Sequence, residues 1–251
     1  MKISNINKSY GAKHVVKDVT FDIPKGKVIS LIGPNGAGKS TVLNIITRLI
    51  SQDSGTVDFQ GTELKKWKSK ELAKKLAILT QSNNINMKLT VKELISFGRF
   101  PHSGNHLTLE DEQMVDMAIS YMELEEFTDR FIDELSGGQL QRAYIAMVIA
   151  QDTDFVFLDE PTNNLDIYHS SNMMKTVRKM CEDLGKTVIL VLHEINFAAC
   201  YSDYIATFKD GELYRFGKVD EIMTKETLKY LYGVEFNIQH TDNGNPIAIY
   251  Y

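Results

Sequence analysis

One eight-residue segment constrains the fold of this 251-residue chain more than any other. Residues 33–40 read Gly-Pro-Asn-Gly-Ala-Gly-Lys-Ser and match the pattern G-x-x-x-x-G-K-S/T. A nearly continuous apolar run, Val28–Ile32, precedes the segment, and apolar residues at helical spacing follow it. The sequence therefore predicts a buried strand, then a glycine-rich loop, then a helix over Ala37–Ile50.

A loop of this kind is suited to binding phosphate. Its glycines let backbone N–H groups turn toward an anion, and the helix N-terminus adds the positive end of its dipole. We expect Lys39 to reach the β- and γ-phosphates of a nucleotide and the Ser40 hydroxyl to bind Mg²⁺. The residues of this segment expected to contact ATP are Asn35, Gly36, Ala37, Gly38, Lys39, Ser40 and Thr41.

An acidic pair follows a second apolar run, Phe155–Leu158. The run predicts a buried strand, and this places Asp159 at the carboxyl end, where doubly wound sheets bind their ligands. Asp159 is expected to hold Mg²⁺ through water. Glu160, the second carboxylate, is expected to polarise the attacking water as a general base.

Strand-like and helix-like segments alternate on both sides of a mostly helical stretch, which predicts an α/β fold. We assign about 1–81 and 151–251 to a catalytic core and about 82–150 to a helical insertion. Arg99–His106, rich in His and Gly, is expected to be a loop within the insertion. His102 and His106 stand four residues apart, but Ser-Gly-Asn between them favours a loop over a metal site.

Local patterns also predict several helices and a hairpin of two strands. Asp210-Gly211 is a strong turn signal between the two strands, and a later Asp-Asn-Gly turn precedes a final strand. The helices are expected over Val91–Gly98, Leu109–Met122 and Gln139–Ile149, and the hairpin strands over Ile205–Phe208 and Glu212–Phe216.

Composition excludes several classes of protein. Asp and Glu number 33 against 28 Lys and Arg, a net charge of −5, which gives no support to a nucleic-acid partner. Cys181 and Cys200 cannot form a disulfide framework and are interpreted as buried thiols. The N-terminal residues show no secretory signal, and no apolar run approaches the about 20 residues of a membrane-spanning helix. We therefore expect a cytoplasmic protein.

A second helix N-terminus offers another place for an anion. Ser136 precedes Gly137, Gly138 and Gln139 and can cap the helix that follows, while the two glycines leave its first amides accessible. Residues 33–40 already provide one cradle for a nucleotide. A second cradle in the same chain suggests the opposite side of a sandwiched triphosphate.

Leu-Ser-Gly-Gly-Gln over residues 135–139, followed by Leu-Gln-Arg-Ala and then by the acidic strand, resembles the signature of the ATP-binding-cassette (ABC) family. Other landmarks of that family occur in order over essentially the whole chain. By resemblance they are Tyr10, which stacks on adenine, Gln81, which senses Mg²⁺, Asp166 in the Asn-Leu-Asp loop that crosses a dimer interface, and His193, the switch histidine near the γ-phosphate.

The resemblance implies a phosphate-loop NTPase core with a mainly parallel sheet, an antiparallel β subdomain and the helical insertion. It also implies a head-to-tail homodimer with two ATP molecules between the chains. Each ATP meets the phosphate loop of one chain and Ser136–Gln139 with Asp166 of the other. The implied catalytic residues are Lys39, Gln81, Glu160 and His193, and the implied Mg²⁺ contacts are Ser40, Gln81 and Asp159.

The remaining implied partners lie in a membrane. Separate permease subunits would dock at the helical insertion, on the cytoplasmic face of the cell membrane. They would connect the chain to a substrate-binding lipoprotein or periplasmic protein. Three segments resemble the branch that imports ferric siderophores, haem and cobalamin. They are Gly98–His102, Leu165–His169 and His193–Ala198. Within that branch, uptake of ferric siderophores is the commonest case.

Two departures and four alternatives accompany this interpretation. Glu194 stands where the family commonly has Asp, and Asn163 stands where Ser is frequent. An exporter subunit shares every catalytic residue, so only the three branch-like segments argue against it. A soluble ABC ATPase usually carries two cassettes or a long coiled coil. A small-molecule kinase would lack the signature and His193, and an inactive interaction module would lack the catalytic residues.

Overall fold

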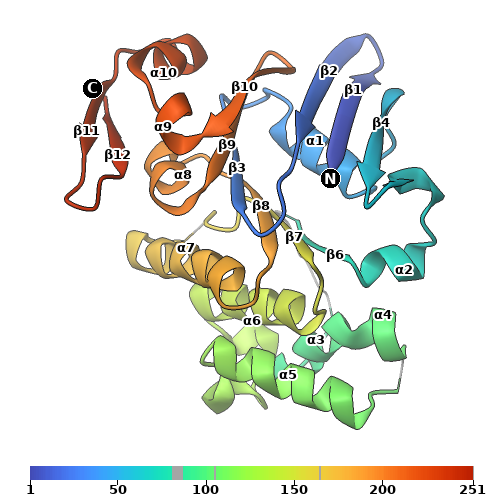
Figure 1. Ribbon diagram of the computed structural model, residues 1–251. Coiled ribbons are helices and arrows are strands. Elements are labelled where there is room, and N and C mark those ends of the chain that lie inside the picture. The colour runs from blue at the N-terminus through green and yellow to red at the C-terminus, as the bar shows by residue number, and fades with distance from the viewer. Residues whose placement is uncertain (81–86, 105, 164, 251) are drawn as a thin grey trace. The chain divides into compact units, whose positions relative to one another are not determined.

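The computed structural model describes residues 1–80, 87–104, 106–163 and 165–250. The chain forms two compact units, whose residues can be located in Figure 1 by the colour scale of residue number. Unit 1 consists of Met1–Trp67 and Met174–Tyr251, and unit 2 consists of Lys68–Met173. Residues 33–40 belong to unit 1, and the stretch 82–150 belongs to unit 2. The functional division at 81/82 and 150/151 stays a prediction.

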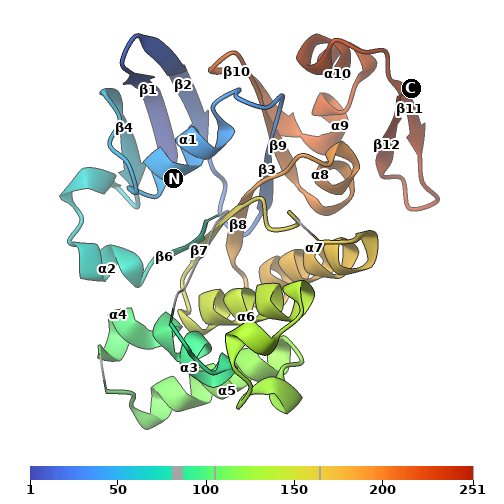
Figure 2. The ribbon, with the colours of Figure 1, turned by 180° about the vertical axis from the view of Figure 1, so that it is seen from behind.

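Unit 1 contains an antiparallel sheet with strand order β2-β1-β4-β5. The strands are β1 (Lys2–Tyr10), β2 (Lys13–Asp22), β4 (Ser54–Phe59) and β5 (Thr62–Glu63). Figures 1 and 2 both show this sheet beside α1 (Lys39–Ile46). This part matches the expected antiparallel β subdomain.

A second group of strands in unit 1 is mainly parallel. β3 pairs in parallel with β8 and β9, and β9 pairs antiparallel with β10. Every residue of β3 and β8 is buried, as a continuous apolar run predicts for a strand covered on both faces. The four strands are β3 (Val28–Ile32), β8 (Thr187–Val191), β9 (Tyr204–Lys209) and β10 (Glu212–Lys218).

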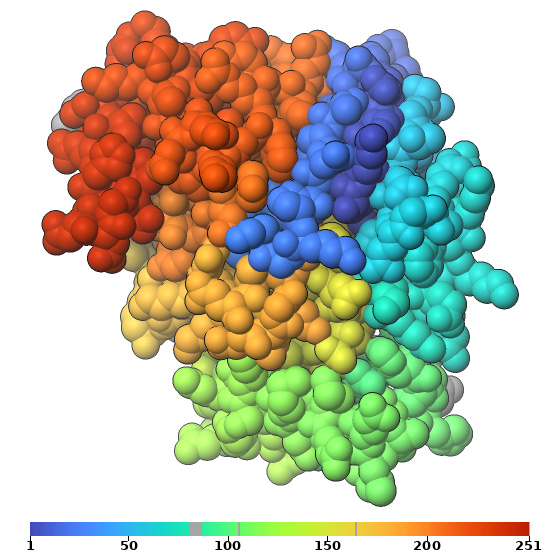
Figure 3. Space-filling view, viewed as in Figure 1, coloured from blue at the N-terminus to red at the C-terminus, as the bar shows by residue number. Residues whose placement is uncertain are grey.

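The predicted turn between β9 and β10 is confirmed. Asp210 and Gly211 have φ angles of 52° and 88°, the positive values that a two-residue hairpin turn of type I′ requires. The Lys17 N–H donates to the Gly211 carbonyl at 2.8 Å, which joins β2 to this turn. Figure 3 shows the N-terminal residues in blue and the C-terminal residues in orange meeting on this face of unit 1.

Shorter elements complete unit 1. They are η1 (Leu64–Lys66), α8 (Ile195–Tyr201), α9 (Val219–Ile222), α10 (Lys225–Tyr232), β11 (Asn237–His240) and β12 (Pro246–Ile249). The Asn196 amide of α8 bonds to the backbone of Ala248 in both directions, at 2.8 and 3.2 Å. These bonds hold the hairpin of β11 and β12 to α8, and β12 is the predicted final strand.

Trp67, the single tryptophan, closes the first segment of unit 1. Its ring lies against Phe59 with centroids 5.5 Å apart, and the Arg48 guanidinium donates to its carbonyl at 2.5 Å. Arg48 itself has φ of 62°, a left-handed conformation that cannot continue a helix. α1 therefore ends at Ile46, and the prediction of a helix as far as Ile50 is wrong.

Unit 2 is mostly helical. β6 and β7 run parallel with Leu76 opposite Phe155, and α6 packs against α3 and α5. α7 (Ile167–Glu182) begins in unit 2 and ends in unit 1. The other elements are α2 (Ser69–Ala73), β6 (Leu76–Leu79), α3 (Val91–Ser96), η2 (Phe97–Arg99), α4 (Phe100–Ser103), α5 (Leu109–Tyr121), η3 (Glu125–Phe127), η4 (Ile132–Glu134), α6 (Gly137–Ala150) and β7 (Phe155–Asp159).

The segment predicted as a loop, Arg99–His106, is partly helical. Arg99 ends η2 and α4 follows at once, so this part of the prediction is wrong. The cause is a buried ion pair: Arg99 Nε donates to Asp111 Oδ1 at 2.8 Å, and Arg99 Nη1 donates to the Ala150 carbonyl at 2.8 Å. His102 shares a hydrogen bond of 2.9 Å with the Gln151 carbonyl, so its ring is used in fixing this turn.

Both cysteines are free, as predicted. Cys181 is buried and Cys200 is half-buried, so the expectation of two buried thiols holds fully only for Cys181. Burial raises the pKa of both thiols. Within the described ranges, no helix combines the length and the apolar character needed to cross a bilayer.

Candidate functional site

The loop of residues 33–40, called the phosphate loop below, depends on two of its glycines for its shape. Gly33 has φ of 146°, and a Cβ there would lie 2.0 Å from the carbonyl oxygen of Phe208. Gly38 has φ of 95°, and a Cβ there would lie 2.7 Å from the carbonyl oxygen of Val15. Any side chain at either position would displace backbone, so the loop keeps its shape only with glycine.

Lys39 lies inside this loop. Its side chain is buried, and Nζ donates to the carbonyl oxygens of Gly33 and Pro34 at 2.7 and 3.0 Å. It is also the first residue of α1, whose N-cap, Gly38, provides no side-chain hydrogen bond. An ammonium group and the positive end of a helix dipole therefore meet at one turn, which is an arrangement that stabilises phosphate.

Two other predicted residues of unit 1 are exposed at strand ends. Tyr10 ends β1 and leaves 53% of its surface exposed, with Lys8 Nζ 5.7 Å from the ring centroid. A largely exposed ring next to a cation can stack on a nucleotide base. His193 is exposed two residues after β8, and the backbone of Glu194 caps α8.

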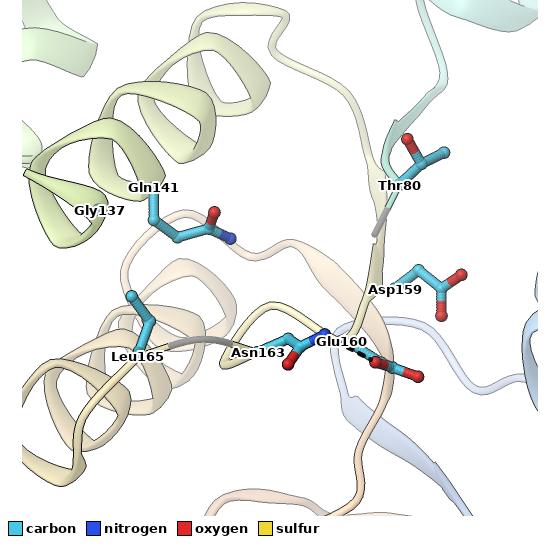
Figure 4. A pocket seen from close by; sticks show the side chains of 7 residues that line it. All are labelled: Thr80, Gly137, Gln141, Asp159, Glu160, Asn163 and Leu165. Atoms are coloured by element: carbon cyan, nitrogen blue, oxygen red, sulfur yellow. Dashed lines mark hydrogen bonds between the residues drawn. The ribbon is translucent and has the colours of Figure 1, made fainter. Parts of the chain in front are cut away.

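Unit 2 carries the acidic pair. Every residue of β7 is buried, and Asp159, its last residue, is only 7% exposed. Glu160 follows in a left-handed conformation with φ of 53°. Figure 4 shows both carboxylates on the same side of the chain. The predicted buried strand with an acidic carboxyl end is thus present.

A cavity of about 150 Å³ adjoins this pair within unit 2, shown in Figure 4. Asn163 Nδ2 donates to Glu160 Oε2 at 3.3 Å, and Gln141 Nε2 donates to the Pro161 carbonyl at 3.1 Å. The lining residues are Thr80, Gly137, Gln141, Asp159, Glu160, Asn163 and Leu165. The start of α6 and the acidic pair therefore face one cavity.

The signature segment opens α6 as predicted. Ser136 is the N-cap, and its Oγ accepts from the N–H of Gln139 at 3.3 Å, while Gln139 Oε1 accepts from the N–H of Ser136 at 2.9 Å. This reciprocal capping box starts the helix although its first two residues are glycines of low helix propensity. The side chains of Ser136 and Gln139 are thus oriented by the helix that they begin.

Asp166 lies at the start of α7. Its Oδ1 accepts from the backbone N–H of His169 at 2.8 Å and from His169 Nδ1 at 2.8 Å. These two hydrogen bonds lower the pKa of the Asp166 carboxyl group and keep it ionised. Asp166 thus caps the start of α7, and its side chain is nevertheless 65% exposed.

The structure groups the predicted residues by unit. Tyr10, residues 35–41 and His193 belong to unit 1, and residues 136–139, Asp159, Glu160 and Asp166 belong to unit 2. Gln81 and Asn164 lie outside the described residues. Sequence reasoning gave no role to Gln141 or His169 and noted Asn163 only as a departure from the frequent Ser. The Asp166–His169 spacing of three is typical of a helix cap.

Comparisons with known proteins give one consistent result. A family model described as ABC transporter matches residues 16–163. The chain is 50% identical over 251 residues to the petrobactin import ATP-binding protein YclP of Bacillus subtilis (strain 168), covering 100% of this chain and 99% of that protein. It is 45% identical over 250 residues to the petrobactin import ATP-binding protein FatE of Bacillus anthracis, covering 100% of both.

A solved structure agrees in fold and in extent. The dimeric structure of MJ0796, a bacterial ABC transporter cassette, is 32% identical and matches with a TM-score of 0.77, covering 87% of this chain and 98% of that one. The α/β prediction, with its mainly parallel and antiparallel parts, is confirmed. With the family match extending from β2 past the acidic pair, the chain belongs to the ABC transporter family.

Proposed function

We propose that this chain is the ATP-hydrolysing subunit of an importer of ferric siderophores. The observation that carries the ATPase activity is the position of the buried Lys39 ammonium inside the phosphate loop, at the uncapped N-terminus of α1. The substrate class rests on full-length identity to two petrobactin import proteins. An exporter subunit is not favoured, because both of these relatives are named for import.

Unit 1 would bind the nucleotide. In this assignment Lys39 and the amides of residues 35–41 hold the β- and γ-phosphates, and Tyr10 stacks on the adenine ring. His193 donates a hydrogen bond to a γ-phosphate oxygen. The Ser40 hydroxyl and the Asp159 carboxylate are hard oxygen donors of the kind that suits Mg²⁺, which when bound offsets the negative charge of the phosphates. Gln81 belongs to the same proposed Mg²⁺ set.

Glu160 would act as the general base. Its hydrogen bond from Asn163 fixes one carboxylate oxygen and leaves the group in the wall of the cavity. A carboxylate in that place can accept a proton from water. Asn163 stands where the ABC family frequently has Ser. We assign the orientation of the Glu160 side chain in part to the Asn163 amide.

Two copies would act together. In a head-to-tail homodimer each ATP is held by one phosphate loop and by Ser136–Gln139 and Asp166 of the other copy. The capping box supports this, because it orients the Ser136 and Gln139 side chains at the surface. The dimer would dock through residues 82–150 on permease subunits at the cytoplasmic face of the membrane. A substrate-binding lipoprotein or periplasmic protein would complete the importer.

Affinity purification tests the partners. The tagged chain is recovered from detergent-solubilised membranes of its source cell, and associated proteins are identified by mass spectrometry. We expect a polytopic permease together with a metal-chelate binding protein. Recovery of an exporter-type membrane protein would preserve the ATPase chemistry and overturn the substrate. Recovery of ribosomes or DNA without membrane proteins would favour the soluble ABC ATPase.

Uptake measurements test the substrate. Deletion of the gene should abolish uptake of ⁵⁵Fe-petrobactin, and the wild-type gene should restore it. The Lys39→Ala variant should fail to restore it, because the phosphate-binding cation is lost. A deletion strain that loses uptake of ⁵⁵Fe-haem or of cobalamin, and keeps uptake of ⁵⁵Fe-petrobactin, would move the chain to the alternative substrates of the same branch.

A further inference from the structure

His169 contacts two separate segments of unit 2. It lies in the first turn of α7, where its Nδ1 is 2.8 Å from Asp166 Oδ1. Because Asp166 is ionised, it can only accept, and the hydrogen must be on His169 Nδ1. The His169 side chain therefore holds Asp166 by a charge-assisted hydrogen bond, in addition to the bond from its own backbone N–H.

The other edge of the His169 ring faces the start of α6. A Cβ at Gly138 would lie 2.6 Å from His169 Cδ2 and 3.0 Å from Nε2. At Gly137, one residue earlier, a Cβ would meet no atom within 4 Å. The ring is thus close to one particular glycine of the signature segment. Glycine at 138 provides the space that the ring occupies.

We propose that His169 is a positioning residue that fixes Asp166 relative to Gly138. The inference rests on the proposed function, in which both of those residues meet the ATP held by the second copy. Two groups that must reach the same nucleotide contribute most to catalysis when the protein sets their spacing before the nucleotide binds. His169 has no contact with ATP in this assignment, so it acts through Asp166 and Gly138.

Exposure distinguishes this role from a stabilising one. The His169 and Asp166 side chains are 46% and 65% exposed. Exposed pairs of this kind contribute little to the free energy of unfolding. Removal of the imidazole should therefore change turnover far more than thermal stability. A purely structural histidine would give the opposite result.

Histidine variants test the hydrogen bond in the intact transporter purified from membranes. His169→Ala should lower kcat for ATP about tenfold, the value of one hydrogen bond to a charged group, with KM for ATP and Tm little changed. His169→Asn should recover most of kcat, because its amide N–H occupies the place of Nδ1–H. His240→Asn, at an exposed position on β11, is the control for the same chemical change.

A double-mutant cycle tests the contact with Gly138. Gly138→Ala should lower kcat in the wild type, since the new Cβ displaces the imidazole from Asp166. In the His169→Asn background the imidazole ring is absent, so Gly138→Ala should lower kcat much less. Equal losses in the two backgrounds, or a His169→Ala variant with wild-type kcat, would overturn the inference. A wild-type complex that hydrolyses no ATP would instead overturn the proposed function on which it rests.

Discussion

Glu160 occupies a backbone conformation that most residues avoid. Its φ of 53° lies in the left-handed region, which costs about 1–3 kcal/mol for a residue with a Cβ. The conformation follows directly on the buried end of β7, so the chain reverses at the point where the cavity begins. The strain is located at the residue to which we assign the general base, which also lines the cavity.

Glu160→Gln tests the assignment at this residue. The amide keeps the shape of the side chain and loses the ability to accept a proton, so we expect ATP to bind and hydrolysis to stall. Single-turnover experiments with radiolabelled ATP should show a fall of about 100-fold or more in the rate of the chemical step. Unchanged turnover would remove Glu160 from the role of base.

Asp111 provides a test that concerns stability instead of chemistry. Burial acts to raise the pKa of its carboxyl group, but hydrogen bonds from Thr108, Arg99 and Ser103 outweigh burial and hold the pKa far below its usual range. A carboxyl group with a lowered folded-state pKa stabilises the fold above its unfolded pKa of about 4, and this stabilisation is lost as the pH falls further. The Arg99–Asp111 pair therefore makes unit 2 sensitive to acid.

We expect Asp111→Asn to lower the free energy of unfolding by about 3–5 kcal/mol at pH 7, because it leaves the buried Arg99 without its counter-ion. Urea unfolding between pH 5 and pH 3 should show a weaker loss of stability with acid in the variant than in the wild type. Asp116→Asn on the same helix is the control. Its side chain is 64% exposed and pairs with Lys92 at 3.4 Å, so the change should cost less than about 1 kcal/mol.

At the scale of elements, the connection from β3 to α1 depends on one very close backbone approach. A Cβ at Gly33 would lie 2.0 Å from Phe208 O, and Phe208 belongs to β9, the neighbour of β3. The Gly33→Ala variant must therefore separate two paired strands or deform the loop. We expect a loss of about 3 kcal/mol or more in the free energy of unfolding, together with weaker ATP binding.

Gly26→Ala is the matched control for this substitution. Gly26 also has a positive φ, 63°, but a Cβ there would meet nothing within 4 Å. Gly26→Ala should therefore lower the free energy of unfolding only by the conformational cost of the positive φ angle, about 1–2 kcal/mol. Chemical denaturation and ATP titration of both variants measure the difference. Equal losses would show that the φ angle, and not the contact with Phe208, determines the requirement for glycine.

Elements with strong local signals were predictable from the sequence. The apolar run of β3, the glycines of the phosphate loop and the Ser136 cap each place their own segment, because the interactions concerned are local. The Asp210-Gly211 turn follows from the same kind of signal, and α6 begins at Gly137, two residues before the predicted Gln139. Most of the candidate site residues could therefore be named from the sequence, and their roles stay predictions.

Other features depend on partners far away in the sequence. The helical turn after Arg99 depends on Asp111 and on the carbonyl of Ala150, 51 residues later. β1 was not predicted because its apolar residues do not alternate regularly, and its pairing with β2 contains bulges. The contact between His169 and Gly138 joins two helices that no periodicity relates. Such contacts become visible only when the chain is folded.

At the scale of the whole molecule, activity should require two copies. Ser136→Arg places a bulky cation where the signature segment would meet the partner's nucleotide. A single copy of the variant should still bind ATP at its phosphate loop, but ATP should not drive dimerisation, and hydrolysis should be lost. Size-exclusion chromatography of Glu160→Gln with and without Ser136→Arg, in ATP, measures the effect. A monomer that hydrolyses ATP at the full rate would contradict the dimeric mechanism.

Trp67 gives this protein a natural optical probe. It is the single tryptophan and the last residue of unit 1 before the chain enters unit 2. Its indole ring lies tilted against Phe59, and its carbonyl accepts a hydrogen bond from Arg48. Fluorescence excited selectively in tryptophan therefore originates from one junction between the two units. A change in this fluorescence on addition of nucleotide would report an altered environment of Trp67 in real time, without any label.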